Sequence, residues 1–409
     1  MTIALPQSVE DPGRRLFGLS VGVFFLGGFL TSIVSLLVPR LRLTMGFGYA
    51  EASIVQLAFH SSYLLFALPI TFALVRLGYM RAIAMGLGVM TVACLGFALA
   101  LGSRRFALLL LALLLLSAGI TFLQIAANTV VTVVGSPAGA ASRLTLLQGF
   151  NSVGTVAGPV IGAGFILGTG GGGGRIASPD IPFLLSALPL AALALAFLRW
   201  RDLLPRTAAA QPAPRELRNI VRDRPLLTGT AAMFAYVGAE VTIGSLLTSY
   251  LMLPTTLGAG AVMAGRMVGL YWGSAMIGRF AGAYALARMR PARLLLAVAL
   301  GAVALTLAAT TLHGAVAAAA LIAVGLMNAV MYPTIYALAL PADAARAPVA
   351  SMWLCMAVVG GAVVPVLTGI AADAVGLARA LVLPALCYAG IALFARDRDR
   401  DLYRDRTAR

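Results

Sequence analysis

The sequence predicts an all-α membrane protein whose helices form twelve transmembrane spans in two six-helix bundles. Composition is the first reason: 61% of the 409 residues are hydrophobic and 11% are charged, whereas soluble domains average about 45–50% apolar and about 25% charged residues. The second is a mean hydropathy of +0.96. The third is that long apolar runs recur from residue 16 to residue 395, which is typical of membrane helices and not of barrel strands. This balance excludes soluble enzymes, secreted mini-proteins and disordered regulators.

Twelve apolar runs are predicted to cross the membrane, and most exceed the ~20 residues that span the hydrocarbon core. They cover residues 16–39, 51–75, 82–102, 106–134, 143–168, 181–199, 226–251, 263–287, 293–311, 315–340, 347–370 and 377–395. The first run is too long for a signal-peptide core, so it is expected to remain as a helix.

The longest polar stretch divides these runs into two sets of six. It covers residues 200–225 and contains four Pro and many charged residues. The predicted organisation is therefore an N-terminal six-helix bundle over 1–199, a linker over 200–225, a C-terminal six-helix bundle over 226–395 and a tail over 396–409.

The basic residues predict the orientation of the chain. All 30 are Arg; in a twelve-span chain, 23 fall on one side of the membrane and 7 on the other. The positive-inside rule places both termini and the linker in the cytoplasm, as in a multi-pass protein of the bacterial inner membrane. The Arg-rich linker and tail are expected to contact anionic lipids, not nucleic acid.

Glu240 stands apart from the other acidic residues. The chain has 14 of them, and the others lie in loops, tails or span edges, whereas Glu240 lies about 14 residues into the span 226–251. At ~1.5 Å per residue this is near the bilayer midplane. An ionisable group there usually faces the bundle interior or a water-filled cavity and marks a substrate or ion path. Tyr236 and Gly244 share its helix face. The alternative is a permanently protonated Glu240 that hydrogen-bonds a neighbouring helix.

Polar side chains recur at helical spacing in three further spans, and we expect them to face the same interior as Glu240. The candidates for substrate contact are Gln124, Asn128, Gln148, Asn151, Asn328 and Tyr332. The alternative is that each joins neighbouring helices, an interaction worth only ~0.6–2 kcal/mol.

Three aromatic or imidazole side chains complete the candidate set. His60 is a candidate second proton carrier because its reference pKa lies near neutrality; the alternative is a hydrogen-bonded core residue. Trp272 and Trp353 could stack on a sugar face or fill the bundle. The sequence has no P-loop, metal-ligand cluster or nucleophile motif, so ATP-driven transport, an enzymatic activity, a metal and a cofactor are not expected.

Five segments resemble the fucose and glucose/galactose branch of the major facilitator superfamily. They are FLQIAANTVVTVVG (122–135), RLTLLQGFNSVGTVAGP (143–159), YVGAEVTIGSLLTSYL (236–251), YWGSAMIGRFAG (271–282) and GLMNAVMYPTIYALAL (325–340). The resemblance runs through both halves of the chain. It implies the major facilitator superfamily fold, which consists of two six-helix bundles, and proton-coupled or sodium-coupled uptake of a hexose-type sugar by alternating access.

The same resemblance assigns roles to individual residues. It implies that the sugar cavity is lined by Gln124, Asn128, Gln148, Asn151, Glu240 and Asn328, and that Arg279 belongs to a gate. The chain departs from the fucose carrier pattern at two acidic positions, where it has Val34-Ser35 and Gln124. Coupling is therefore expected at Glu240, helped by His60, and an uncoupled sugar facilitator is the alternative.

Two other functions remain open on the sequence alone. One is an exporter of drugs or metabolites with the same fold, which would favour a wide apolar cavity. The other is a non-transporting sensor or assembly factor. The chain is expected to act as a monomer with a small neutral sugar, a proton and membrane lipids as its partners.

Overall fold

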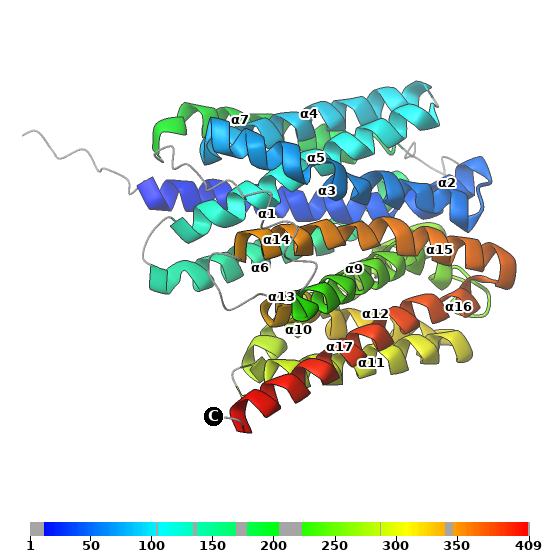
Figure 1. The fold of residues 1–409 in the computed structure, drawn as a ribbon. Helices are drawn as coiled ribbons and strands as arrows, with labels where there is room; N and C mark the ends of the chain where they lie inside the picture. The colour runs from blue at the N-terminus through cyan, green and yellow to red at the C-terminus, as the bar shows by residue number, and fades with distance from the viewer. Residues whose placement is uncertain are drawn as a thin grey trace, which may run out of the picture.

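The computed structural model describes residues 12–103, 105–133, 137–168, 178–203, 223–286, 288–339 and 347–407. Within these ranges the regular backbone is helical and contains no strand. Figure 1 shows long helices that run side by side along one direction. The predicted all-α architecture is thereby confirmed.

The first helix set contains α1 to α7, followed by a short 3-10 turn. Its elements are α1 (Pro12–Ser35), α2 (Leu37–Met45), α3 (Tyr49–Leu77), α4 (Tyr79–Ser103), α5 (Phe106–Val133), α6 (Pro137–Ile166), α7 (Ile181–Arg199) and η1 (Arg201–Leu203). Inside this set α4 packs on α5 and α7, and α1 packs on α6.

The second helix set contains α9 to α17. Its elements are α9 (Arg224–Leu251), α10 (Ala261–Leu286), α11 (Pro291–Thr311), α12 (Gly314–Asn328), α13 (Met331–Ala339), α14 (Ala347–Met356), η3 (Ala357–Val359), α15 (Gly360–Val375), α16 (Leu377–Ala380) and α17 (Val382–Thr407). Here α9 packs on α15 and α17, while α11 packs on α12 and α17. The helix α17 continues through most of the segment predicted as a tail, where Asp399 pairs with Arg293 at 3.2 Å.

Proline explains two breaks inside predicted spans. The span 16–39 divides between α1 and α2 at Leu36 because Pro39 has no N–H to donate to the Ser35 carbonyl, four residues earlier. The span 315–340 divides between α12 and α13 at Ala329 and Val330 because Pro333 has the same relation to Ala329.

Eleven helical stretches in the described part of the chain are long and apolar enough to cross a membrane. The predicted eighth span, 263–287, is not among them, although it forms the 26-residue helix α10. This helix is long enough at ~1.5 Å per residue, but repeated glycines together with Arg266 and Arg279 lower its hydropathy.

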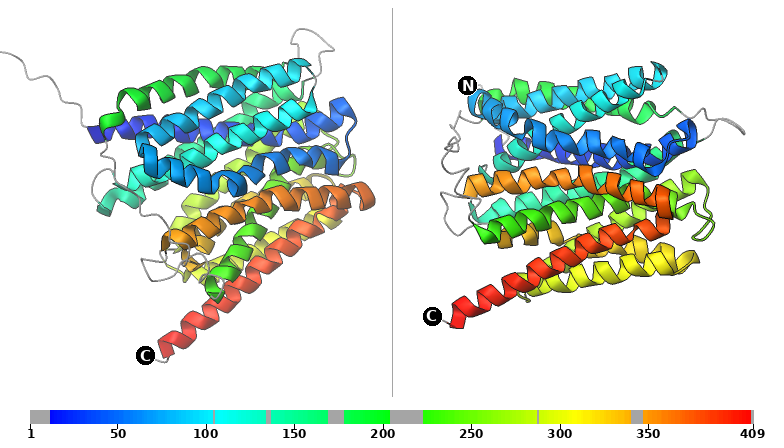
Figure 2. Two further views of the ribbon diagram at one scale, coloured as in Figure 1. Left: turned by 45° about the horizontal axis from the view of Figure 1, so that its top comes forward. Right: turned by 45° about the vertical axis from the view of Figure 1, so that its right-hand side comes forward.

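The bundle has two ends, to which the following sections refer. At the terminal end α1 begins at Pro12 and α17 ends at Thr407; at the opposite end α3 begins at Tyr49 and α15 ends at Val375. These ends lie at the left and right of Figure 1, and the two rotated views in Figure 2 show the same arrangement.

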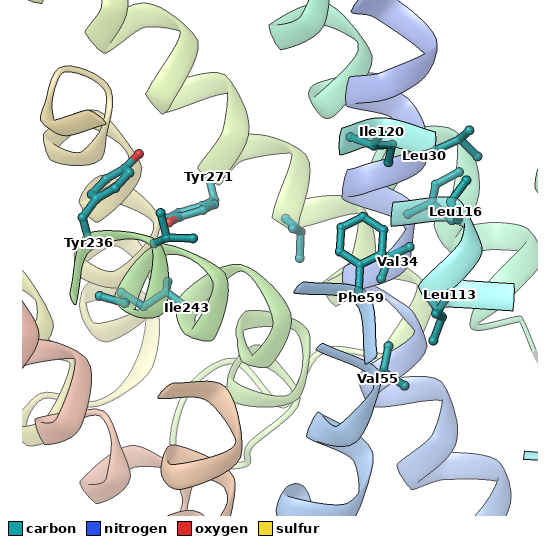
Figure 3. Close-up of a cluster of buried hydrophobic side chains, with 14 of the residues drawn as sticks. Leu30, Val34, Val55, Phe59, Leu113, Leu116, Ile120, Tyr236, Ile243 and Tyr271 are labelled. Atoms are coloured by element: carbon teal, nitrogen blue, oxygen red, sulfur yellow. The ribbon is translucent and has the colours of Figure 1, made fainter. Parts of the chain in front are cut away.

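The two helix sets meet chiefly along two seams, α3 against α15 and α6 against α10. Each set also has its own buried apolar side chains. Figure 3 shows a group around Phe59 in the first set, separate from Tyr236, Ile243 and Tyr271 in the second.

Candidate substrate and proton site

Glu240 lies in the middle of α9, a helix with a well-formed start. The Asp223 carboxylate accepts a hydrogen bond from the Leu226 N–H at 3.2 Å, and Pro225 occupies the first turn, where a missing N–H does no harm. Glu240 follows about 24 Å along the axis at ~1.5 Å per residue. Its side chain is half-buried and is hydrogen-bonded to the Tyr236 side chain one turn earlier. The structure thus brings this predicted pair together.

Arg279 is the counter-charge for Glu240. It lies on α10, two turns before that helix ends at Leu286, and within electrostatic range of both Glu240 and Tyr236. Its Nη1 also donates a hydrogen bond to Ser152 Oγ on α6. A charge inside a protein needs partners to offset its lost hydration. Arg279 has two: the Glu240 side chain in the second helix set and the buried Ser152 hydroxyl in the first.

Asn328 is fully buried and takes part in a hydrogen-bond network behind Glu240. Its Nδ2 donates to the Tyr271 hydroxyl at 2.8 Å, and that hydroxyl lies 3.4 Å from the Glu240 main-chain oxygen, which it approaches as a donor. Figure 3 shows Tyr236 on α9 and Tyr271 on the neighbouring helix α10. The sequence analysis did not select Tyr271, although it lies in the same motif as Arg279. Its hydroxyl group within an apolar span could have indicated a buried hydrogen bond.

Tyrosines connect Glu240 to the first helix set. The rings of Tyr236 and Tyr332 lie 6.3 Å apart, and Tyr332 is within electrostatic range of both Glu240 and Tyr63. Tyr63 on α3 is in turn hydrogen-bonded to the side chain of Gln124 on α5, and Gln124 is exposed. Two predicted substrate residues, Tyr332 and Gln124, therefore belong to one polar and aromatic surface that ends at Glu240.

The residues Tyr236, Glu240, Tyr271, Arg279, Asn328 and Tyr332 form what we call the Glu240 cluster. It combines a carboxyl, a guanidinium, an amide and three phenols, which are groups that exchange protons and hydrogen-bond to hydroxyls. Within the described residues no group of three or more His, Cys, Asp or Glu side chains is arranged to hold a metal ion.

Two predicted residues of the fifth span, now α6, have local partners. Asn151 Nδ2 donates to the Phe24 carbonyl of α1 at 3.0 Å, so this amide joins two helices of the first set. Gln148 is half-buried, and its main-chain oxygen accepts a hydrogen bond from Ser152 Oγ at 2.9 Å. Asn128 belongs to α5, but its side chain lies outside the described residues.

Both predicted tryptophans are half-buried. The Nε1 atoms of Trp272 and Trp353 are buried and have no hydrogen-bond partner in the described part of the chain. Trp272 also covers the bare backbone at Gly244, where an added Cβ would lie 3.2 Å from the indole Cζ2. A buried indole N–H without a protein partner is a free donor for a ligand oxygen.

His60 lies in the seam between α3 and α15. Its Nδ1 is 3.1 Å from the Gln56 carbonyl oxygen, and its ring contacts Phe59 and Tyr63 with centroid distances of 5.1 and 6.2 Å. It also packs so closely on Gly361 that an added Cβ would lie 2.7 Å from its Cδ2. His60 is therefore buried in a packed environment beside Tyr63.

A surface groove of about 430 Å³ lies away from the Glu240 cluster, between α4 and α5. Its lining consists of Met85, Gly88, Val89, Val92 and Leu115. None of these side chains is a strong hydrogen-bond donor or acceptor, so this groove does not suit a polar solute.

Together, the fold and this site define a polytopic membrane transporter. Residues 19–344 match the sequence model of the Major Facilitator Superfamily, and the chain belongs to this family. The resemblance drawn from five sequence segments and the predicted fold are both confirmed.

Individual relatives cover almost the whole chain. It is 36% identical over 398 residues to the glucose/galactose transporter of Brucella abortus biovar 1 (strain 9-941), covering 95% of this chain and 96% of the relative. It is 28% identical over 412 residues to the L-fucose-proton symporter of Escherichia coli (strain K12), covering 94% and 93%. Among solved structures it resembles FucP, a Major Facilitator Superfamily transporter, in the outward conformation, with a TM-score of 0.71, 26% identity and coverage of 95% and 99%.

Proposed function

We propose that this protein is a secondary transporter that imports a hexose-type sugar together with a proton by alternating access. The observation that carries the proposal is the half-buried Glu240, hydrogen-bonded to Tyr236 and within electrostatic range of Arg279 in the middle of the bundle. The 36% identity to a glucose/galactose transporter supports the sugar class, and the 28% identity to an L-fucose-proton symporter supports proton coupling.

The proposal includes an orientation and a division of the chain. The excess of Arg on one side supports a cytoplasmic terminal end in a bacterial inner membrane. The helix contacts support a division into two bundles, over 1–199 and 226–395. In the proposed cycle these bundles would move relative to each other around the Glu240 cluster. The linker 200–225 and the tail 396–409 would then lie in the cytoplasm, and the opposite end would face outward.

Sugar hydroxyls would be bound by groups from both bundles. The free indole N–H groups of Trp272 and Trp353 are available donors, and their rings offer faces on which a sugar can pack. Gln124 provides a further amide from the first helix set. We keep Asn128 and Gln148 as candidates for the same site. The Asn151 amide already donates to the Phe24 carbonyl of α1, so we assign Asn151 to joining these two helices.

Proton binding would act through the charge balance of the cluster. When Glu240 is charged, it and Arg279 attract each other; when a proton neutralises it, the guanidinium keeps its hydrogen bond to Ser152 on α6. Because Glu240 and Arg279 both belong to the second helix set, the proton changes how tightly Arg279 is held within that set, and so how strongly its guanidinium can bind Ser152 of the first. With the sugar bound, the neutral Glu240 would let the bundles rock, and proton loss to the cytoplasm would reset the carrier. Each proton that enters gains ~2.3 kcal/mol per 100 mV of membrane potential.

One observation favours a second candidate, an uncoupled sugar facilitator. Arg279 could hold Glu240 charged throughout the cycle, because an adjacent cation stabilises a carboxylate. The carboxylate would then bind sugar hydroxyls without taking up a proton.

Uptake into proteoliposomes distinguishes these functions. Purified protein should accumulate radiolabelled glucose or galactose when the lumen is alkaline, and a protonophore should abolish accumulation. Equilibration without accumulation, whatever the pH or sodium gradient, would support the facilitator. If no hexose is transported while lipophilic cations are expelled, the chain is an exporter and the proposal is wrong.

A further inference from the structure

We propose that Asp373 is a latch that closes the opposite end of the bundle by capping the first turn of α3. The inference rests on the proposed transport cycle, in which this end must open to admit solute. Two hydrogen bonds carry it. The Tyr49 N–H donates to Asp373 Oδ1 at 2.6 Å, and the Ala50 N–H donates to Oδ2 at 2.8 Å.

These bonds join the two helix sets. Asp373 lies in the last turn of α15 in the second set, and Tyr49 begins α3 in the first. The donors and acceptors are 324 and 323 residues apart in sequence. This contact is therefore one that must break if α3 and α15 separate.

The position of Asp373 in its own helix is electrostatically unfavourable. The C-terminal end of a helix carries a partial negative charge, so a carboxylate in its last turn is repelled by the carbonyls around it. The start of α3 offers the reverse: a partial positive charge and N–H groups that have no acceptor within the helix. The 29-residue α3 begins after Gly48, which has no side chain to cap it. The helix's own first-turn carboxylate, Glu51, accepts from the Gly48 N–H at 3.2 Å. The carboxylate of α15 caps the next two N–H groups, those of Tyr49 and Ala50.

Two glycines allow the carboxylate to approach. A Cβ at Gly48 would lie 2.8 Å from Asp373 Oδ2, and a Cβ at Gly369 would lie 2.7 Å from the Tyr49 carbonyl oxygen. Any larger residue at either position would push α15 away from α3. Arg42, whose guanidinium lies 3.3 Å from the centroid of the Tyr49 ring, holds the same turn from the side of α2.

The latch differs in kind from the rest of the seam. At Gly361 the seam is formed by the His60 ring against bare backbone, a van der Waals contact whose strength falls off gradually with separation. Hydrogen bonds to a carboxylate are directional and short in range. The Asp373 contact therefore sets a threshold for opening that apolar packing alone does not provide.

Distance measurements between spin labels test the latch without any substrate. Labels at Leu43 on α2 and Leu312 at the end of α11 would report the separation of the two helix sets at the opposite end. Both residues are exposed, at 52% and 45%. The native cysteines Cys94, Cys355 and Cys387 would first be replaced, so that only the introduced cysteines are labelled. In Asp373→Ala we expect the ratio of short to long distances to fall about tenfold, which corresponds to about 1.4 kcal/mol.

Asp180→Asn is the matched control, because it removes an acidic residue at the same end that caps nothing on the second helix set. It should leave the distances unchanged. Unchanged distances in folded Asp373→Ala, or an equal shift in both variants, would overturn the latch. If Asp373→Ala does not fold, Gly369→Ala serves instead, since its new Cβ meets the Tyr49 carbonyl; it should shift the distances in the same direction, and no shift would overturn the proposal. If the distances shift as expected but the protein transports no hexose, the latch stands and only the proposed function is refuted.

Discussion

Asn328 of α12 donates its side-chain amide to the Tyr271 hydroxyl at 2.8 Å. Since Asn328 is fully buried and that hydroxyl reaches the main chain at Glu240, this pair supports the turn of α9 that carries the central carboxyl. The amide predicted as a sugar ligand is thus arranged to position Glu240.

Tyr271→Phe should destabilise the protein by about 1–3 kcal/mol, because it removes the hydroxyl to which the buried Asn328 Nδ2 donates. Thermal unfolding in detergent measures this change. Tyr284→Phe is the control on the same helix: Tyr284 is 64% exposed, so its effect should stay within about 0.5 kcal/mol. Equal effects from the two variants would show that the buried hydrogen bond contributes nothing specific.

Asn151→Ala should lower the unfolding temperature and leave hexose binding in place, because the Asn151 amide is engaged with the Phe24 carbonyl. The loss of one part-buried interhelical hydrogen bond in a membrane bundle is expected to be ~0.6–2 kcal/mol. Ligand-induced thermal stabilisation separates the two effects. A variant with unchanged stability and no response to glucose or galactose would instead show that Asn151 contacts the sugar.

Trp272→Phe should weaken hexose binding by a factor of about 2 to 10. This factor corresponds to the ~0.5–1.5 kcal/mol of one lost hydrogen bond, from the indole N–H to the sugar. The phenyl ring keeps a contact with Tyr271 but loses the indole Cζ2 that lies over Gly244, so some loss of stability accompanies the change. Titration of intrinsic fluorescence with sugar measures the affinity. Trp200→Phe, at the end of α7, is the control and should bind as the parent does. If both variants bind equally well, the free indole N–H of Trp272 is not a sugar donor.

Arg279→Gln should move the pH at which uptake is half-maximal to a higher value. Removing the nearby positive charge favours the protonated, uncharged form of Glu240. The coupling proton therefore binds at a lower proton concentration than in the parent protein. Uptake measured across a series of external pH values gives the profile. Arg266→Gln on the same helix, where Arg266 is exposed, should leave it unchanged. If the pH profile of Arg279→Gln coincides with that of the parent protein, Arg279 has no influence on proton coupling.

Local rules explain why most of the fold could be predicted from the sequence. Each long apolar run forms a helix because a single segment in a membrane can satisfy its backbone hydrogen bonds internally only in that way. The breaks at Leu36 and Ala329 follow from prolines three or four residues later. Glu240 was found because it is an acidic residue in the middle of an apolar run.

The interactions between the helix sets could not be predicted in this way. Arg279 reaches Ser152 over a sequence separation of 127 residues, and neither hydropathy nor helical spacing determines which two helices become neighbours. The contact of Asn328 with Tyr271 could not be predicted for a related reason: an amide that faces a sugar and one that faces a neighbouring tyrosine have the same helical spacing. For Asp373 a signal was present, since an acidic residue in the last turn of a helix is unfavourable, but its partner was not identifiable.

Transport by Glu240→Gln proteoliposomes tests the central claim most directly. Gln keeps the size and hydrogen-bonding capacity of the side chain but cannot take up or release a proton. We predict that a pH gradient no longer drives hexose accumulation in this variant, while counterflow exchange of labelled against unlabelled hexose continues. Accumulation at the parent's level in Glu240→Gln would contradict the account, because the proton would then be carried by another group.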